Sequence, residues 1–298
     1  MTAAAAASGT EGSRRGTLYV VATPIGNLGD VTLRSLDVLR AVSVVAAEDT
    51  RLTRRLWARH GIETPLLSYH AQSPASRRNE LLERLERGQD VALVTDAGTP
   101  LVSDPGGELV TEWAERGGTV VPIPGASAVL AALVASGIPA PRWGFDGFLP
   151  RSGSERKRRL ARIAADDRAT VLFESPGRTA ATLRDLAAAC GGERRAAVAR
   201  ELTKRHEEVR RGTLAGLAAS AAETPPRGEV TIVVSGADLE HGTPASEAAE
   251  AASLDAALAQ VAALVAAGTS RSDAARQVSA TTGIPRRQLY GAPDRKSG

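Results

Sequence analysis

Between Thr17 and Gly137, short β-branched runs alternate with longer segments in which apolar side chains recur with a helical period. The runs predict strands at Leu18–Ala22, Val42–Ala46, Val91–Thr95 and Thr119–Ile123. The intervening segments predict helices at Thr32–Arg40, Thr50–His60, Pro74–Arg87 and Glu108–Arg116. Strands connected through helices pair in parallel, because each helix carries the chain back to the start of the next strand. The pattern therefore predicts an α/β domain with a mostly parallel sheet and helices on both faces.

Two prolines in Ile138–Arg142 predict a domain boundary, since proline ends a helix. A second, smaller α/β domain is expected beyond it. Its strands are predicted at Phe145–Leu149, Thr170–Glu174, Ala196–Arg200 and Glu229–Ser235, and its helices at Ser154–Ala165 and Arg178–Ala189. We therefore expect an N-terminal α/β domain over residues 17–140 and a C-terminal one over residues 141–236.

The ends of the chain differ in composition from these domains. Residues 1–16 are rich in Ala, Ser and Gly and predict a disordered tail, in which Arg14 and Arg15 follow the alanines, the wrong order for a secretory signal. Residues 237–252 predict a linker. Residues 253–298 predict a helical segment with helices at Leu254–Ala267 and Arg271–Thr282. That pair fits a helix–turn–helix and equally a hairpin that packs on the body of the protein.

Composition excludes several classes of protein. The chain has 298 residues, of which 43% are hydrophobic, so it is not disordered throughout. Its longest apolar stretch, Ala128–Ala135, is far shorter than the roughly 20 residues of a membrane span. A single cysteine, Cys190, excludes a disulfide framework and multi-cysteine metal sites, and no HExxH or CxxC motif is present. We expect a cytoplasmic protein without a metal or a membrane contact.

Arginine dominates the basic residues, because only three of 37 are lysines. The planar guanidinium suits phosphate, although codon usage in a GC-rich genome gives the same bias. The segment Arg151–Arg162 is densely basic, which predicts either an RNA-binding helix or a solvated face. The expected RNA contacts are Arg51, Arg54, Arg151, Arg156, Lys157, Arg158, Arg159, Arg200 and Arg205.

Three loops that follow predicted strands are rich in Gly, Pro and hydroxyl residues: 22–30 (ATPIGNLGD), 95–107 (TDAGTPLVSDPGG) and 122–128 (PIPGASA). Parallel sheets place ligands at the carboxyl ends of their strands, so these loops predict a binding site, although each alone can be a tight turn. Neither G-x-G-x-x-G nor G-x-x-x-x-G-K-[ST] is present, which removes the main support for a dinucleotide or P-loop site. A small adenosine-like ligand held by backbone groups remains.

The order of motifs identifies a family resemblance. GTLYVVATPIGNLGDVTLRSLDVL, VVAAEDTR, LLSYH, ALVTDAGTPLVSDPG and PIPGASA follow one another, and VLFESPGR, VARELTKRHEEVRRGTL and RGEVTIVVSG come later. Together they resemble the tetrapyrrole methylase superfamily, and within it the branch that methylates the 2′-hydroxyl of a cytidine in the decoding region of small-subunit ribosomal RNA. The resemblance spans roughly residues 16–236.

This resemblance implies S-adenosylmethionine as methyl donor, a two-domain fold with the active site in the cleft between the domains, and a homodimer. It implies small-subunit ribosomal RNA, or the assembled small subunit, as partner. The implied donor-binding residues are Pro24, Ile25, Gly26, Asp96, Gly98, Thr99, Leu101, Ser127, Ala128, Phe173 and Thr231. Two departures stand out: Ala71-Gln72-Ser73 follows SYH where the family usually has His-Asn, and Gly177 replaces a histidine before Arg178.

A ribose hydroxyl is a weak nucleophile, so a nearby base or cation would assist its deprotonation. The sequence offers Glu48, Asp49, His70, Glu201 and Lys204 as candidates. Four of the five also have a structural interpretation: Asp49 at a helix N-terminus, His70 as a hydrogen-bonded loop residue, and Glu201 with Lys204 as an ion pair. Two other functions stay open, a methyltransferase acting on a corrin precursor and a non-enzymatic nucleic-acid-binding regulator.

Overall fold

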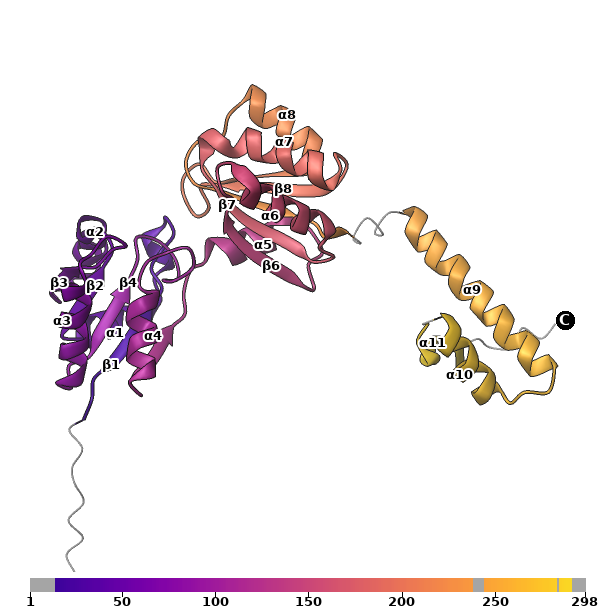
Figure 1. Ribbon diagram of the computed structural model, residues 1–298, viewed down its shortest axis with the longest axis horizontal. Coiled ribbons are helices and arrows are strands. Elements are labelled where there is room, and N and C mark those ends of the chain that lie inside the picture. The colour runs from indigo at the N-terminus through magenta and orange to yellow at the C-terminus, as the bar shows by residue number, and fades with distance from the viewer. Residues whose placement is uncertain (1–13, 238–243, 283, 291–298) are drawn as a thin grey trace, which may run out of the picture. The chain divides into compact units, whose positions relative to one another are not determined.

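The computed structural model describes residues 14–237, 244–282 and 284–290 (Figure 1). The chain divides into two compact units, Met1–Ala237 and Asp238–Gly298. The first unit contains two sheets, and we refer to the part built on each sheet as a lobe. None of the described helices is long and apolar enough to cross a membrane.

The first lobe is a five-stranded sheet in the order β3-β2-β4-β1-β5, in which all pairs are parallel. Its strands are β1 (Thr17–Val21), β2 (Val44–Ala47), β3 (Leu66–Ser68), β4 (Val91–Val94) and β5 (Thr119–Ile123), and its helices are α1 (Leu33–Ala41), α2 (Thr50–His60), α3 (Ala75–Glu86) and α4 (Gly107–Glu115). Leucines of α1 and α2 pack on one face, and those of α3 and α4 pack on the other. The predicted parallel sheet with helices on both faces is confirmed.

The second lobe is a mixed sheet in the order β6-β7-β10-β8-β9, where only the β6–β7 pair is parallel. Its strands are β6 (Trp143–Phe148), β7 (Ala169–Glu174), β8 (Arg195–Arg200), β9 (Glu208–Thr213) and β10 (Val230–Val234), and its helices are α5 (Ala128–Ser136), α6 (Gly153–Ala165), α7 (Thr179–Cys190) and α8 (Leu214–Glu223). The sequence did not predict β9 or α8. Strand β9, with the sequence EVRRGT, is a half-exposed edge strand. It lacks the alternation of apolar residues by which strands are predicted.

Helix α5 follows the last strand of the first lobe but packs on the sheet of the second. Its Val129 and Ala132 contact Val171 of β7 and Val233 of β10, on the face opposite to α6, α7 and α8. Its C-terminal carbonyls accept hydrogen bonds from Arg211 of β9, including one of 2.6 Å at Ala135. The boundary expected after residue 140 assigns α5 to the first domain, whereas its packing joins it to the second lobe.

The second unit consists of α9 (Pro244–Ala266), α10 (Arg271–Thr282) and α11 (Arg286–Tyr290). They enclose a small core of their own, which includes Val261, Val278 and Leu289. Helix α9 starts at Pro244 and not at Leu254, so the expected linker over 237–252 is helical from 244 onward. Proline is favoured in the first turn of a helix, and the alanines and glutamates that follow it are strong helix formers.

The predicted N-terminal tail ends earlier than expected. Residues 1–13 lie outside the described part of the chain, but Arg14–Gly16 are described and Gly16 is buried. The backbone N–H of Gly16 donates to the carbonyl of Leu85, and the Arg15 guanidinium forms an ion pair with Glu86 and lies over the Trp113 ring. These last residues therefore belong to the first lobe.

The expected RNA contact at Arg156 is wrong. Arg156 belongs to the basic helix α6, but the residue is buried, with only 7% exposed. It donates to the carbonyl of Pro150 at 2.8 Å, to Thr182 Oγ1 at 3.1 Å and to the Asp185 carboxylate at 2.7 Å. Because its donors are engaged inside the protein, Arg156 is a structural residue that ties α6 to α7.

We predict that Arg156→Ala lowers the free energy of unfolding by about 1–3 kcal/mol, because it leaves buried acceptors without their donor. The neighbouring exposed Lys157→Ala serves as control and should change it by less than about 0.5 kcal/mol. Urea denaturation measures both. Equal effects of the two substitutions would contradict a structural role for Arg156.

Candidate functional site

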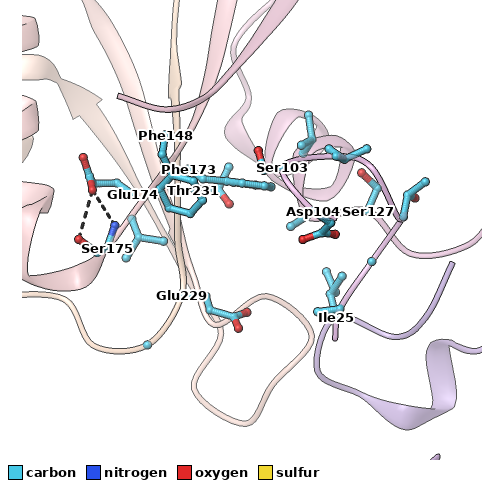
Figure 2. Close-up of a pocket in the computed structure, with 18 of the residues that line it drawn as sticks. Ile25, Ser103, Asp104, Ser127, Phe148, Phe173, Glu174, Ser175, Glu229 and Thr231 are labelled. Carbon is cyan, nitrogen blue, oxygen red and sulfur yellow. Dashed lines mark hydrogen bonds between the residues drawn. The ribbon is translucent and has the colours of Figure 1, made fainter. Parts of the chain in front are cut away.

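The two lobes enclose a cavity of about 350 Å³ (Figure 2). The first lobe contributes Ile25 and residues 97–99 and 102–104, and the start of α5 contributes residues 127–129. The second lobe contributes Phe148 and residues 173–176 and 228–231. The volume lies in the range of small-molecule sites, roughly 300–1,000 Å³. The three loops singled out in the sequence thus form one wall of this cavity.

Two of these loops are joined by backbone hydrogen bonds. The N–H of Thr23 donates to the Gly98 carbonyl at 2.8 Å, and the N–H of Gly98 donates back to Thr23 at 3.1 Å. Gly98 has φ +81°, and a Cβ atom there would lie 3.3 Å from Ile25 Cγ2. A glycine is required at this position because other residues rarely adopt that φ angle. The loops after β1 and β4 therefore meet at the sheet edge as predicted.

The loop after β4 contains two non-glycine residues in the left-handed region, Leu101 (φ 73°) and Ser103 (φ 68°). Such conformations cost energy and persist where the surrounding structure fixes them, often at functional sites. Here they precede Asp104, whose carboxylate is directed into the cavity in Figure 2. Burial raises the pKa of Asp104 to about 6, and the negative charges of Glu48 and Asp96 act in the same direction.

Aromatic side chains form the opposite wall. Phe173 of β7 packs edge-on against Phe145, with ring centroids 4.9 Å apart, and at 5.7 Å from the ring of Phe148. A shift in the β6–β7 register between Phe145 and Gly147, where Gly147 has φ +61°, changes the direction of the strand just before Phe148. This wall offers apolar surface against which a planar ring can pack.

The charged groups that line the cavity are all acidic: Asp104, Glu174 and Glu229. Glu174 is 2% exposed and is held by Thr182 Oγ1 at 2.7 Å, by the backbone N–H of Ser175 at 2.7 Å and by Arg178 at 3.2 Å. Glu229 forms an ion pair of 3.1 Å with Lys204. No Lys, Arg or His is among the lining residues in the described part of the chain, so the site disfavours a phosphate group and favours a ligand that carries positive charge.

Seven of the eleven expected donor-binding residues line the cavity: Ile25, Gly98, Thr99, Ser127, Ala128, Phe173 and Thr231. Ser127 also caps α5, since its hydroxyl accepts from the N–H of Leu130. The other four, Pro24, Gly26, Asp96 and Leu101, do not line it. The Asp96 carboxylate accepts the N–H of Asp49 at 2.9 Å, and the Lys204 side chain covers Gly26.

Sequence reasoning missed several lining residues, notably Asp104, Phe148, Glu174 and Glu229. Asp104 and Glu174 stand inside the quoted motifs TDAGTPLVSDPG and VLFESPGR, so the motifs were the available signal. Glu229 likewise stands inside the quoted motif RGEVTIVVSG, whereas Phe148, in strand β6, lies outside the quoted motifs. No local pattern in the sequence places Phe148 at the cavity.

None of the five candidate catalytic residues is among the described residues that line the cavity. The Asp49 carboxylate caps α2 and forms an ion pair with Arg51, whose hydrogen bonds hold the pKa of Asp49 down at about 2. Glu201 and Lys204 form an ion pair of 2.9 Å. His70 is exposed, and its Nδ1 accepts the N–H of Gln72. These contacts match the structural interpretation of each residue.

Glu48 contacts the loop after β4, which contributes residues to the cavity wall. Its carboxylate accepts the backbone N–H of Asp96 at 3.4 Å, and burial raises the pKa of Glu48. Within the described part of the chain, no group of three or more His, Cys, Asp or Glu side chains is arranged to hold a metal ion.

The remaining expected RNA contacts fall into two groups. In the described ranges, Arg54, Arg151, Lys157 and Arg205 are exposed and have no ion-pair partner. The others are paired with carboxylates: Arg51 with Asp49, Arg158 and Arg159 with Glu155, and Arg200 with Glu208. A neighbouring carboxylate neutralises part of the positive charge that attracts a phosphate, so the first group offers the freer contacts.

Comparisons with known proteins give the same family as the motifs. A family model described as Tetrapyrrole (Corrin/Porphyrin) Methylases matches residues 17–218. A protein of Synechocystis sp. (strain ATCC 27184 / PCC 6803 / Kazusa) is 46% identical over 92% of this chain and 96% of its own length. A Bacillus subtilis (strain 168) protein is 40% identical over 94% of each chain. Both are named ribosomal RNA small subunit methyltransferase I.

Solved structures share the fold at lower identity. The cobalt precorrin-4 methyltransferase, a cobalamin biosynthetic enzyme, is 19% identical with a TM-score of 0.57 and covers 74% of this chain and 94% of its own. The uroporphyrin-III C-methyl transferase of Thermus thermophilus, solved with S-adenyl homocysteine, is 19% identical with a TM-score of 0.55 and covers 76% of this chain and 100% of its own. The two-lobed α/β architecture predicted from the sequence is confirmed, and the chain belongs to the tetrapyrrole (corrin/porphyrin) methylase family of methyltransferases.

Proposed function

We propose that the protein transfers a methyl group from S-adenosylmethionine to the 2′-hydroxyl of a cytidine ribose in small-subunit ribosomal RNA. The observation that carries the proposal is the cavity between the lobes, which combines an aromatic wall with three carboxylates and no cationic side chain among its described lining residues. Relatives over more than nine tenths of the chain are named ribosomal RNA small subunit methyltransferase I, which favours RNA over a corrin precursor. Because they match through both lobes and are named as enzymes, a non-enzymatic regulator has no remaining support.

The residues of the cavity fit this methyl donor. Its adenine can pack on apolar surface from Ile25, Phe148 and Phe173, and its sulfonium and ammonium groups carry the positive charge that the acidic lining as a whole favours. The donor supplies an activated methyl group on sulfur. What the chain must supply is position and exclusion of water, which follow from a cavity built on rigid strand ends and one helix N-terminus.

The exposed cations around α6 suit the proposed RNA partner. Arg151 and Lys157 border an open groove between α6 and α7, and neither has a carboxylate partner in the described structure. Clustered cations of this kind bind phosphates and release counterions. The chain has only nine aromatic residues, so recognition through backbone shape is expected. An assembled small subunit as substrate implies action in the cytoplasm.

The exposed apolar side of α5 supports a homodimer. Leu130 and Val134 stand one turn apart, on one side of the helix, and Val134 is 84% exposed. We propose that a second copy of the chain covers this side. Adjacent exposed apolar side chains favour burial against a partner, because contact removes them from water.

The first prediction of the proposed function concerns the donor site. Ser127→Trp should weaken S-adenosylmethionine binding at least tenfold, because the indole fills the cavity. Ser127→Ala removes the helix cap without filling the site, so it should lose much less donor affinity than Ser127→Trp while losing about 1 kcal/mol of stability. Calorimetric titration of both variants, with the exposed Ser76→Trp as a further control, measures this. Normal binding by Ser127→Trp would remove the third loop from the site.

The second prediction concerns RNA. The double variant Arg151→Ala/Lys157→Ala should weaken binding to small ribosomal subunits and flatten the plot of log affinity against log salt by about 0.7–0.9 for each phosphate that the variant no longer neutralises. Donor binding should not change. Arg87→Ala, an exposed arginine next to α3 that pairs with Glu83, is the matched control. Parallel salt plots for the double variant and the wild type would contradict a phosphate contact at α6.

The third prediction concerns assembly. Val134→Lys should convert a dimer to a monomer, because a charge at the contact must be desolvated. Sedimentation equilibrium gives the mass, and since the side chain is exposed the fold should persist by circular dichroism. A wild-type protein that sediments as a monomer would refute the dimer.

A further inference from the structure

Asp104 is the carboxylate of the cavity that the described structure leaves without an ion-pair partner. The other two lining carboxylates are engaged: Glu174 lies within an internal network with Thr182 and Arg178, and Glu229 pairs with Lys204. Both therefore already accept hydrogen bonds from donors of the protein. Among the described lining carboxylates, Asp104 is the one that faces the cavity without a cationic partner.

The loop that carries Asp104 is fixed on two sides. Leu101 and Ser103 hold left-handed backbone conformations, and a Cβ atom at Gly147 of β6 would lie 3.1 Å from Ser103 Oγ. The loop thus packs against the second lobe at the point where β6 changes register. Figure 2 shows the Asp104 carboxylate directed into the cavity from the first-lobe side. Backbone strain of this kind clusters at active sites and ligand clamps.

The surroundings of Asp104 favour its protonated form. Burial is the largest cause of its raised pKa, the carboxylates of Glu48 and Asp96 add to it, and the Thr95 hydroxyl offsets part of it. Across the cavity stand Glu174 and Glu229, which are also acidic. No cationic side chain among the described lining residues opposes these effects. A carboxylate with a pKa of about 6 is a stronger base than an ordinary aspartate and is still ionised at neutral pH.

We propose that Asp104 is the general base that accepts the proton of the ribose hydroxyl. This inference rests on the proposed function, since it assumes a hydroxyl as methyl acceptor. The O–H proton passes to an Asp104 carboxylate oxygen while the hydroxyl oxygen forms its bond to the methyl carbon. The C–S bond of the donor breaks, and its electron pair stays on sulfur, which becomes a neutral thioether.

The balance of charge in this step supports the assignment. The reactants bring one negative charge on Asp104 and one positive charge on the sulfonium, and the step removes both. A half-buried site of low polarity favours a reaction in which opposite charges disappear, because the products need less solvation than the reactants. The same burial that raises the pKa of Asp104 therefore also favours methyl transfer.

The test uses Asp104→Asn and Asp104→Glu in the full-length protein, with the exposed Asp37→Asn of α1 as control. Donor binding is measured by calorimetry, and single-turnover methyl transfer to small ribosomal subunits is measured from pH 5 to 8. The wild-type rate should rise about tenfold per pH unit below pH 6 and then level off. Asp104→Asn should be slower by roughly 10²–10⁴-fold and lack this rise. Asp104→Glu should keep the rise, and Asp37→Asn should match the wild type.

Thermal unfolding gives a readout that is independent of activity. The raised pKa means that the folded protein carries a penalty for ionised Asp104, which is present above pH 6 and disappears towards pH 3.8. Asp104→Asn should therefore unfold at a higher temperature than the wild type at pH 8 and at the same temperature near pH 4. A loss of activity without this gain would indicate a damaged fold and would contradict the assignment.

Two further results would overturn the assignment, and a third would refute the function on which it rests. One is a pH rise retained by Asp104→Asn. Another is a loss of donor affinity large enough to explain the whole loss of rate, which would make Asp104 an anchor for the donor. A wild-type protein that methylates no small-subunit RNA would refute the proposed function itself. The measurement on the wild type alone gives that result, so it is distinguished from a failure of the Asp104 assignment.

Discussion

The packing of α5 against the second sheet is the contact on which the rest of the first unit depends. The helix has the sequence AVLAALVAS, so almost any of its sides can be buried. It follows the last strand of the first lobe, and its Val129 and Ala132 pack on β7 and β10 of the second. Ile25 and Ala97 of the first lobe belong to the same apolar cluster, so α5 lies where the two lobes meet, and Arg211 bonds its C-terminal carbonyls within the second lobe. The packing also places the N-terminus of α5, with Ser127 and Ala128, at the cavity. The same helix therefore contributes to the packing between the lobes and to the wall of the cavity.

How far the sequence could predict the fold depended on how local the causes were. The helix at Thr50–His60 and the strand at Thr119–Ile123 were predicted with their observed bounds, because a cap, a glycine or a β-branched run fixes them locally. Strand β9 was missed because an edge strand can be charged. The position of α5 was missed because its uniformly apolar sequence gives no direction, and only the second sheet decides which side it covers.

The site shows the same division. Residues in glycine-containing turns, such as Gly98, Ser127 and Ile25, were predicted because loops after parallel strands must meet at one edge. The charged candidates fared less well. Asp49, Glu201 and Lys204 stand in conspicuous motifs, yet they serve as a cap and as an ion pair, and Arg156 in the basic helix is internal. Charge in a sequence does not say whether the partner is a ligand or a neighbouring side chain, since burial and pairing are set by tertiary structure.

The division of the cavity between distant parts of the chain has a consequence for truncated or interrupted forms of the gene product. A fragment that ends after β5 would retain the glycine loops and the left-handed segment around Ser103, yet it would lack Phe173, Thr231 and the helix that contributes Ser127. A fragment that begins at β6 would carry the aromatic wall without the loops that face it. Neither fragment contains a complete site. If the two fragments are produced separately and mixed, ligand binding would depend on which fragment carries α5. Because the α5 sequence is almost entirely apolar, a fragment that ends or begins with this helix would expose an apolar surface through which the two fragments could associate.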